Sequence, residues 1–113
     1  MSWNYELLSS LWLKNKWIDK ASANVASTHY GAYSITTKEG LKIVSINSDF
    51  WYSPNIFNFA NFSNPDPSGI MKFLIDELEV SEKADQRVWI IGHVPSSSGI
   101  KNPTALFLSL IHI

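Results

Sequence analysis

The chain has 113 residues, a formal net charge of −1 and 45% hydrophobic residues, a composition typical of one small globular domain. It has no cysteine, which excludes disulfides, thiolate metal sites and cysteine nucleophiles, and it has no basic run, so we expect no nucleic-acid partner. Because no apolar run reaches the length of a membrane span, we also expect no transmembrane segment. Aromatic residues make up 13% of the chain, and so many rings require a substantial core or an interface.

The first part of the chain predicts a helix, a loop and a β-hairpin. Apolar residues recur at helical spacing over about residues 3–20, which indicates an amphipathic helix. Residues 21–28 are small and polar and are predicted to form a loop. Two stretches with β-branched and aromatic residues, 30–36 and 41–47, flank a turn that contains Gly40, and together they predict the hairpin.

A second helix is predicted after an irregular segment at residues 53–65. Asp66 and Pro67 form a strong helix start, because a carboxylate can accept hydrogen bonds from first-turn amides and proline has the backbone angle of the first helical position. The predicted apolar stripe of this helix consists of Ile70, Phe73, Leu74 and Leu78. The charged residues predicted to face water are Glu77, Glu79, Glu82 and Lys83.

The apolar run at residues 88–91 predicts a strand buried on both faces of an α/β sheet. Because it follows a helix, the two elements predict the second half of a βαβ crossover. Gly92 and His93 come directly after this strand, at the end where α/β sheets bind ligands, and Gly92 is expected to allow a sharp turn. The residues alone leave two interpretations of His93: a polar cap of a core strand, or a side chain that points into a binding crevice.

Other polar residues are weaker candidates for a site. His29 lies in a small polar loop, which favours a solvent-exposed or structural role. Asn47 and Asp49 follow the second hairpin strand, where they could line a cleft or make an Asx turn. Asn61 begins an Asn-Phe-Ser acceptor pattern for N-glycosylation, which matters only on the secretory path.

Several blocks, in their order and spacing, resemble the acid sphingomyelinase-like phosphodiesterases, a branch of the calcineurin-like metallophosphoesterases. The blocks are Trp3-Asn4-Tyr5-Glu6, Tyr30-Gly31-Ala32-Tyr33-Ser34, Gly40 to Asn47, Asn64 to Gly69, Phe73 to Leu78, and Val88 to Pro95. The resemblance implies an α/β (α+β) fold, as a fragment of a metallophosphoesterase β-sandwich flanked by helices. It runs over about residues 3–107, so we expect residues 1–107 to be part of a catalytic domain.

The resemblance implies a hydrolase that cleaves sphingomyelin or a related phosphodiester with two divalent metal ions, zinc being the expected metal. Such ions would activate a bridging water for in-line attack on the phosphoryl group. In this family the Gly-His after the last strand supplies an imidazole ligand, so the resemblance assigns His93 to the metal. Asn47, Asp49 and the aromatic loop Phe50-Trp51-Tyr52 are expected near the substrate, because they follow a strand on the same predicted sheet edge. The resemblance also implies a secreted, or vacuolar or lysosomal, glycoprotein, and peripheral membrane contact is compatible with it.

The family's other metal-binding motifs are Asp-x-His, a further Asp ligand, Asn-His-Glu and Gly-His-x-His. None of these motifs is found in the chain. We expect the first three before Met1 and the fourth after the C-terminus, so the chain alone is expected to be an inactive internal fragment. Residues 108–113 resemble a translated transposase adapter, so we expect a non-native tail and do not count His112 as a ligand; a genuine apolar tail is the alternative. The alternatives to an enzyme are a short, non-catalytic, aromatic-rich binding protein and a degenerate paralogue.

Overall fold

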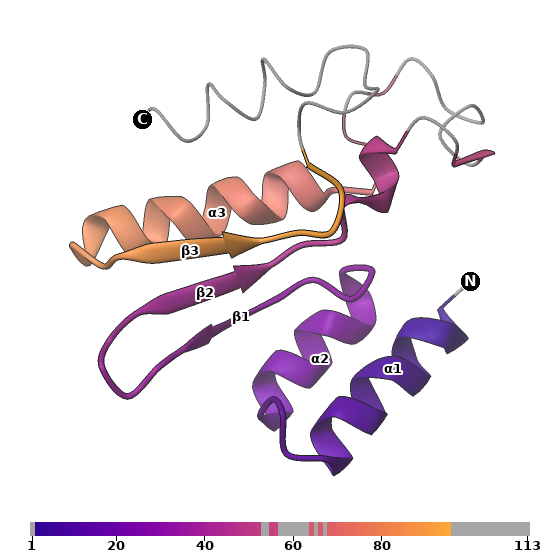
Figure 1. The fold of residues 1–113 in the computed structure, drawn as a ribbon, viewed down its shortest axis with the longest axis horizontal. Helices are drawn as coiled ribbons and strands as arrows, with labels where there is room; N and C mark the ends of the chain where they lie inside the picture. Colours follow the sequence, from indigo (N-terminus) through magenta and orange to yellow (C-terminus); the bar gives the residue numbers. More distant parts are fainter. Residues whose placement is uncertain (1, 53–54, 57–63, 65, 67, 96–113) are drawn as a thin grey trace.

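The computed structural model describes residues 2–52, 55–56, 64, 66 and 68–95. The elements are α1 (Trp3–Lys14), α2 (Lys20–Thr28), β1 (Tyr33–Thr36), β2 (Lys42–Ser45), the 3₁₀ helix η1 (Ser48–Trp51), α3 (Ile70–Lys83) and β3 (Val88–Ile91). This combination of helices and a sheet confirms the predicted α/β class (Figure 1). None of the helices among the described residues has both the length and the hydropathy of a membrane span.

The three strands form one mixed sheet in the order β1-β2-β3. β1 and β2 pair antiparallel with Tyr33 opposite Ser45, and Gly40 in the connecting turn has a φ of 84°, so the predicted hairpin is confirmed. β2 and β3 pair parallel with Lys42 opposite Val88. α3 lies between these two strands in the sequence and packs against the sheet, which confirms the predicted βαβ crossover.

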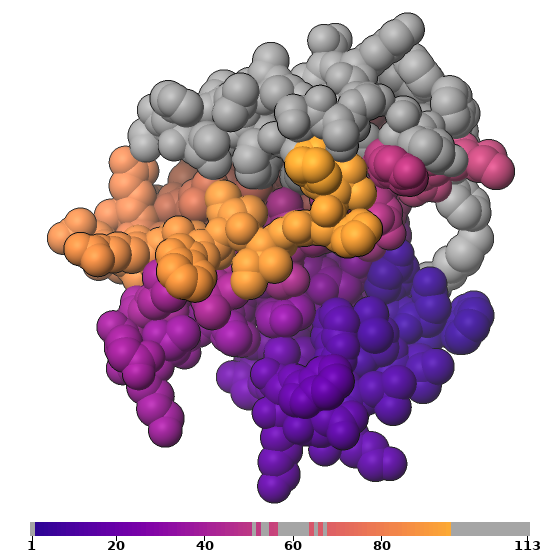
Figure 2. Space-filling model, viewed as in Figure 1, coloured from indigo at the N-terminus to yellow at the C-terminus, as the bar shows by residue number. Residues whose placement is uncertain are grey.

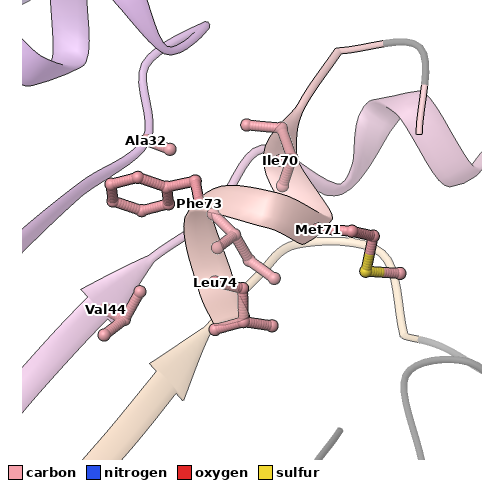
Figure 3. Close-up of a cluster of buried hydrophobic side chains, with 7 residues drawn as sticks. Ala32, Val44, Ile70, Met71, Phe73 and Leu74 are labelled. Atoms are coloured by element: carbon pink, nitrogen blue, oxygen red, sulfur yellow. The ribbon is translucent and has the colours of Figure 1, made fainter. Parts of the chain in front are cut away.

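The core lies between α3 and one face of the sheet. Figure 3 shows the Phe73 ring of α3 beside Ala32, with Val44 of β2 on the same side of the helix. The buried cluster consists of Ala32, Val44, Ile46, Ile70, Met71, Phe73 and Leu74, with Leu78 partly buried against it. The apolar stripe predicted for this helix is therefore confirmed.

The predicted extent of the N-terminal helix was wrong, because two helices occupy this part of the chain. Lys16 has a φ of 60°, which a continuing right-handed helix cannot have, and α1 therefore ends at Lys14. Asp19 then caps α2, its carboxylate accepting a hydrogen bond from the Ser22 amide at 2.7 Å. The small residues that suggested a loop form the packing face of α2, where Ala26 is fully buried.

The cap of α2 gives the chain a pH dependence. The hydrogen bonds from Ser22 hold the pKa of the Asp19 carboxyl below its usual value. A carboxyl with a lowered folded-state pKa stabilises the fold above its unfolded pKa, and this contribution is lost as the pH falls through the folded pKa. We therefore expect the wild-type unfolding temperature to fall more between about pH 5 and about pH 3 than that of Asp19→Asn, which keeps an acceptor oxygen but does not titrate. An equal fall in both proteins would contradict this origin of the pH dependence.

α3 begins three residues later than predicted, although the predicted capping residue is correct. The Asp66 carboxylate accepts hydrogen bonds from the amides of Met71 and Lys72 at 3.1 and 3.0 Å. The helix starts at Ile70 because Gly69 adopts a left-handed conformation with a φ of 72°. The expected start at Pro67 was therefore wrong.

β3 is not buried on both faces within the described structure, which corrects the sequence prediction. Trp89 is 63% exposed and Ile91 is 50% exposed, whereas Val88 and Ile90 pack toward the core. β3 is the edge strand of the described sheet and α3 covers only one of its faces. Figure 2 shows the β3 region at the molecular surface.

One charged residue of α3 does not simply face water as predicted. The Glu77 carboxylate lies 2.6 Å from the ammonium group of Lys42 on β2, with 24% and 9% of the two side chains exposed. Lys72 and Asp76 form a second ion pair at 2.8 Å, which is well exposed. Glu79, Glu82 and Lys83 are exposed, as predicted. The partly buried pair of Lys42 and Glu77 therefore links α3 to the sheet.

Candidate functional site

The loops that follow β2 and β3 lie at the same edge of the sheet, because these two strands run parallel (Figure 1). Asn47, Asp49 and Trp51 follow β2, with Trp51 as the last residue of η1, and His93 follows β3. The structure thus brings all four predicted site residues to one edge of the sheet. Their roles stay predictions.

A buried hydrogen bond joins the two loops. The Ser48 hydroxyl oxygen accepts a hydrogen bond from the Val94 amide at 2.7 Å, and Ser48 is only 2% exposed. A Cβ placed at Gly92 would lie 3.4 Å from the same oxygen, so the backbone before His93 passes directly against Ser48. Gly92 is not among the residues with a positive φ, and the chain bends directly after it, at His93 and Val94. The observed feature is a close approach of the two loops.

His93 presents an exposed imidazole at this edge. It forms no hydrogen bond or ion pair with the part of the chain that the structure describes. Within the same residues, no three His, Asp or Glu side chains lie close enough together to hold a metal ion. His93 could supply one ligand, so a complete metal centre does not fit the described residues by themselves.

Asn47 makes an Asx turn, which was one of the two roles that the sequence left open for it. Its side-chain oxygen accepts a hydrogen bond from the Asp49 amide at 3.1 Å. Its amide group donates to the Tyr30 carbonyl at 3.0 Å and to the Tyr5 hydroxyl at 3.4 Å. Asp49 is exposed. Asn47 therefore fixes the start of η1 against two distant parts of the chain.

Two further aromatic rings, those of Tyr5 and Tyr30, lie in the same region and were not assigned to the site from the sequence. Tyr30 contacts both Tyr5 and Phe50 edge to face, at ring distances of 5.5 and 4.9 Å. Burial raises the pKa of the Tyr5 hydroxyl, and the charges of Asp49 and Tyr30 add to this effect, while the hydrogen bond with Asn47 opposes it. Nothing in the local pattern around Tyr5 separates it from other residues of an amphipathic helix.

The remaining histidine within the described structure has local contacts, in line with the structural role that the sequence favoured. His29 follows α2, and its Nδ1 lies 2.9 Å from the Thr28 hydroxyl and 3.1 Å from the Val25 carbonyl. Its ring centroid is 5.4 Å from that of Phe73 on α3. His29 therefore packs the end of α2 against α3. Asn61, His112 and the whole of residues 108–113 lie outside the described residues.

Comparison with known proteins identifies relatives of the chain, although no protein-family model matches it. It is 28% identical over 95 residues to sphingomyelin phosphodiesterase B of Dictyostelium discoideum and 30% identical over 93 residues to sphingomyelin phosphodiesterase 2 of Caenorhabditis elegans. It is 29% identical over 92 residues to the cyclic GMP-AMP phosphodiesterase SMPDL3A of Homo sapiens. These matches cover 83%, 82% and 80% of this chain, but the chain spans only 14%, 14% and 19% of the three relatives. The predicted resemblance is therefore confirmed: over about four fifths of its length, the chain is similar to the acid sphingomyelinase-like phosphodiesterases.

Proposed function

We propose that the intact protein is a phosphodiesterase, a hydrolase that cleaves sphingomyelin or a related phosphodiester. The observation that carries this proposal is the similarity of the chain to proteins that are all named as phosphodiesterases. Those names give two different substrates, sphingomyelin and cyclic GMP-AMP, which share a phosphodiester bond. Phosphodiester hydrolysis is therefore supported more strongly than any particular substrate head group.

In this proposal His93 supplies one imidazole ligand to a centre of two divalent ions, with zinc as the expected metal. Its support is the exposed imidazole at the carboxyl end of a parallel strand, where α/β sheets bind ligands. The further ligands would come from outside the described residues, so we expect no turnover from the 113-residue chain alone. Asn47, Asp49 and Trp51 would lie near the substrate, since they occupy the same edge.

The protein made from the full-length transcript tests the role of His93. We expect His93→Ala to lower kcat/KM for sphingomyelin and for bis(p-nitrophenyl) phosphate by more than about 100-fold, because loss of a partner outside the ligand shell already lowers activity or metal affinity by about 10- to 100-fold. His29→Ala is the matched control, because it removes an exposed imidazole whose contacts are with α2 and α3. It should stay within about threefold of wild type. Equal turnover by His93→Ala and His29→Ala would refute the assignment.

The proposal also includes a location, with entry to the secretory path and delivery outside the cell or to a vacuole or lysosome. Similarity to sphingomyelin phosphodiesterases supports contact with a sphingolipid surface, and Asn61 would then be available as a glycosylation acceptor. The expected sequence feature is a signal peptide encoded upstream of the present chain.

A second candidate is a non-catalytic binding role, either for a short protein or for a degenerate paralogue. The observation that favours it is the exposure of three tryptophans, Trp3, Trp17 and Trp89. Exposed aromatic side chains are enriched at surfaces that bind partners or lipid. This candidate predicts no turnover by the full-length product, so the assay above separates the two functions.

A further inference from the structure

We propose that Ser48 is the positioning residue for His93, because its buried hydroxyl holds the loop on which the imidazole is carried. The purpose of this arrangement, to place a metal-binding imidazole, rests on the proposed function. The structural part of the proposal is that Ser48 restrains the loop that carries His93. This part rests only on the observed contacts.

Both neighbours of His93 lie beside Ser48, and one of them is hydrogen-bonded to it. On one side, the Val94 amide donates to the Ser48 hydroxyl oxygen at 2.7 Å, in a buried position that joins residues 46 apart in the sequence. On the other side, Gly92 lies next to Ser48, where an added Cβ would be at a contact distance of 3.4 Å from that oxygen. Val94 is itself buried, whereas His93 is exposed. The backbone after His93 is therefore held by a buried hydrogen bond while the His93 side chain stays accessible.

Ser48 can act as an anchor because its own position is fixed. It begins η1, and Asn47 directly before it bonds to the Asp49 amide, the Tyr30 carbonyl and the Tyr5 hydroxyl. These bonds connect η1 to α1 and to the turn before β1. Through Ser48, the His93 loop is thus connected to α1 and to the turn before β1.

This restraint matters because a ligand must be held within about 0.5 Å of its working position. Replacing Ser48 with alanine would remove the acceptor of the Val94 amide. A buried amide left without an acceptor is strongly disfavoured, so the loop is expected to open to reach water. The opening would displace His93 without removing any part of the core.

Amide hydrogen exchange of the 113-residue chain tests the proposal without a metal or a substrate. In the wild type the Val94 amide should exchange slowly, and Ser48→Ala should speed its exchange at least about tenfold, with increased nanosecond mobility of the His93 backbone in ¹³C relaxation. Ser48→Thr, which retains the hydroxyl, should restore most of the protection. Ser81→Ala is the matched control: Ser81 is equally buried, and its hydroxyl donates to the Glu77 carbonyl inside α3 at 2.8 Å. It should leave exchange of Val94 unchanged once global stability is taken into account.

The outcomes separate this proposal from the proposed function. Fast exchange of Val94 in the wild type, or equal exchange in Ser48→Ala and Ser81→Ala, would overturn the restraint itself. In the full-length protein, Ser48→Ala should lower kcat at least about tenfold and Ser81→Ala should not, and unchanged kcat beside a loosened Val94 would overturn the positioning role. If His93→Ala retains full turnover, the proposed function fails, while the Val94 exchange still decides whether Ser48 holds the loop.

Discussion

Leu74→Ala is expected to lower the free energy of unfolding by about 3 to 5 kcal/mol, measured by urea denaturation. Leu74 is fully buried at the centre of the cluster between α3 and the sheet, so its removal leaves a cavity as well as losing apolar contacts (Figure 3). Leu7→Ala makes the same chemical change on α1, where the side chain is about half exposed, and it should cost less than about 1 kcal/mol. Similar losses in the two variants would contradict the placement of α3 against the sheet.

Glu77→Ala is expected to destabilise the chain by about 2 to 4 kcal/mol, because it leaves the Lys42 ammonium buried without its carboxylate. The partial exposure of Glu77 places the expected loss below that for a fully buried pair. The exposed pair provides the control, and Asp76→Ala should have a much smaller effect because Lys72 stays solvated.

A double variant tests whether the loss comes from the orphaned charge. Lys42→Met combined with Glu77→Leu replaces both charges with apolar groups and should recover most of the lost stability, because no unpaired charge remains. Denaturation curves of the single and double variants give the coupling free energy. A double variant as unstable as Glu77→Ala would show that the ion pair itself, and not the unpaired ammonium, accounts for the loss.

The features that the sequence predicted correctly depend on local patterns. The hairpin follows from two β-branched stretches around Gly40, and the crossover follows from a helix directly before an apolar strand. α2 was missed because alanines and serines suit both a loop and a helix that packs closely, and only the Asp19 cap with buried Ala26 decides between them. Local pattern therefore identified element types better than it identified where helices end.

Burial was harder to predict because it depends on what covers each residue. The β3 run has the composition of a strand covered on both faces, yet the described elements cover only one, which leaves Trp89 at the surface. Glu77 lies in an acidic run typical of a solvated helix face, and its partner Lys42 is 35 residues away in the sequence. The residues next to them in the sequence indicate neither the exposure of Trp89 nor the ion pair of Glu77.

The location of the candidate site could be predicted from the sequence. The contacts that hold its loops in place could not. Parallel strands place the residues after β2 and β3 at one edge, so Asn47 and His93 were expected there from topology alone. Ser48 lies between two polar residues and looks like part of an exposed turn, whereas the structure buries its hydroxyl against Val94. Such a contact between distant loops becomes visible only in the folded chain.

Sequencing the full-length transcript through both ends of this reading frame tests the central claim most directly. We expect a signal peptide and the Asp-x-His and Asn-His-Glu motifs upstream, and a Gly-His-x-His motif downstream in place of residues 108–113. These motifs would supply the ligands that His93 lacks among the described residues. A transcript without the upstream motifs, and with a stop codon in authentic gene sequence directly after Ile113, would contradict the claim and leave His93 as a strand-end residue of a binding protein.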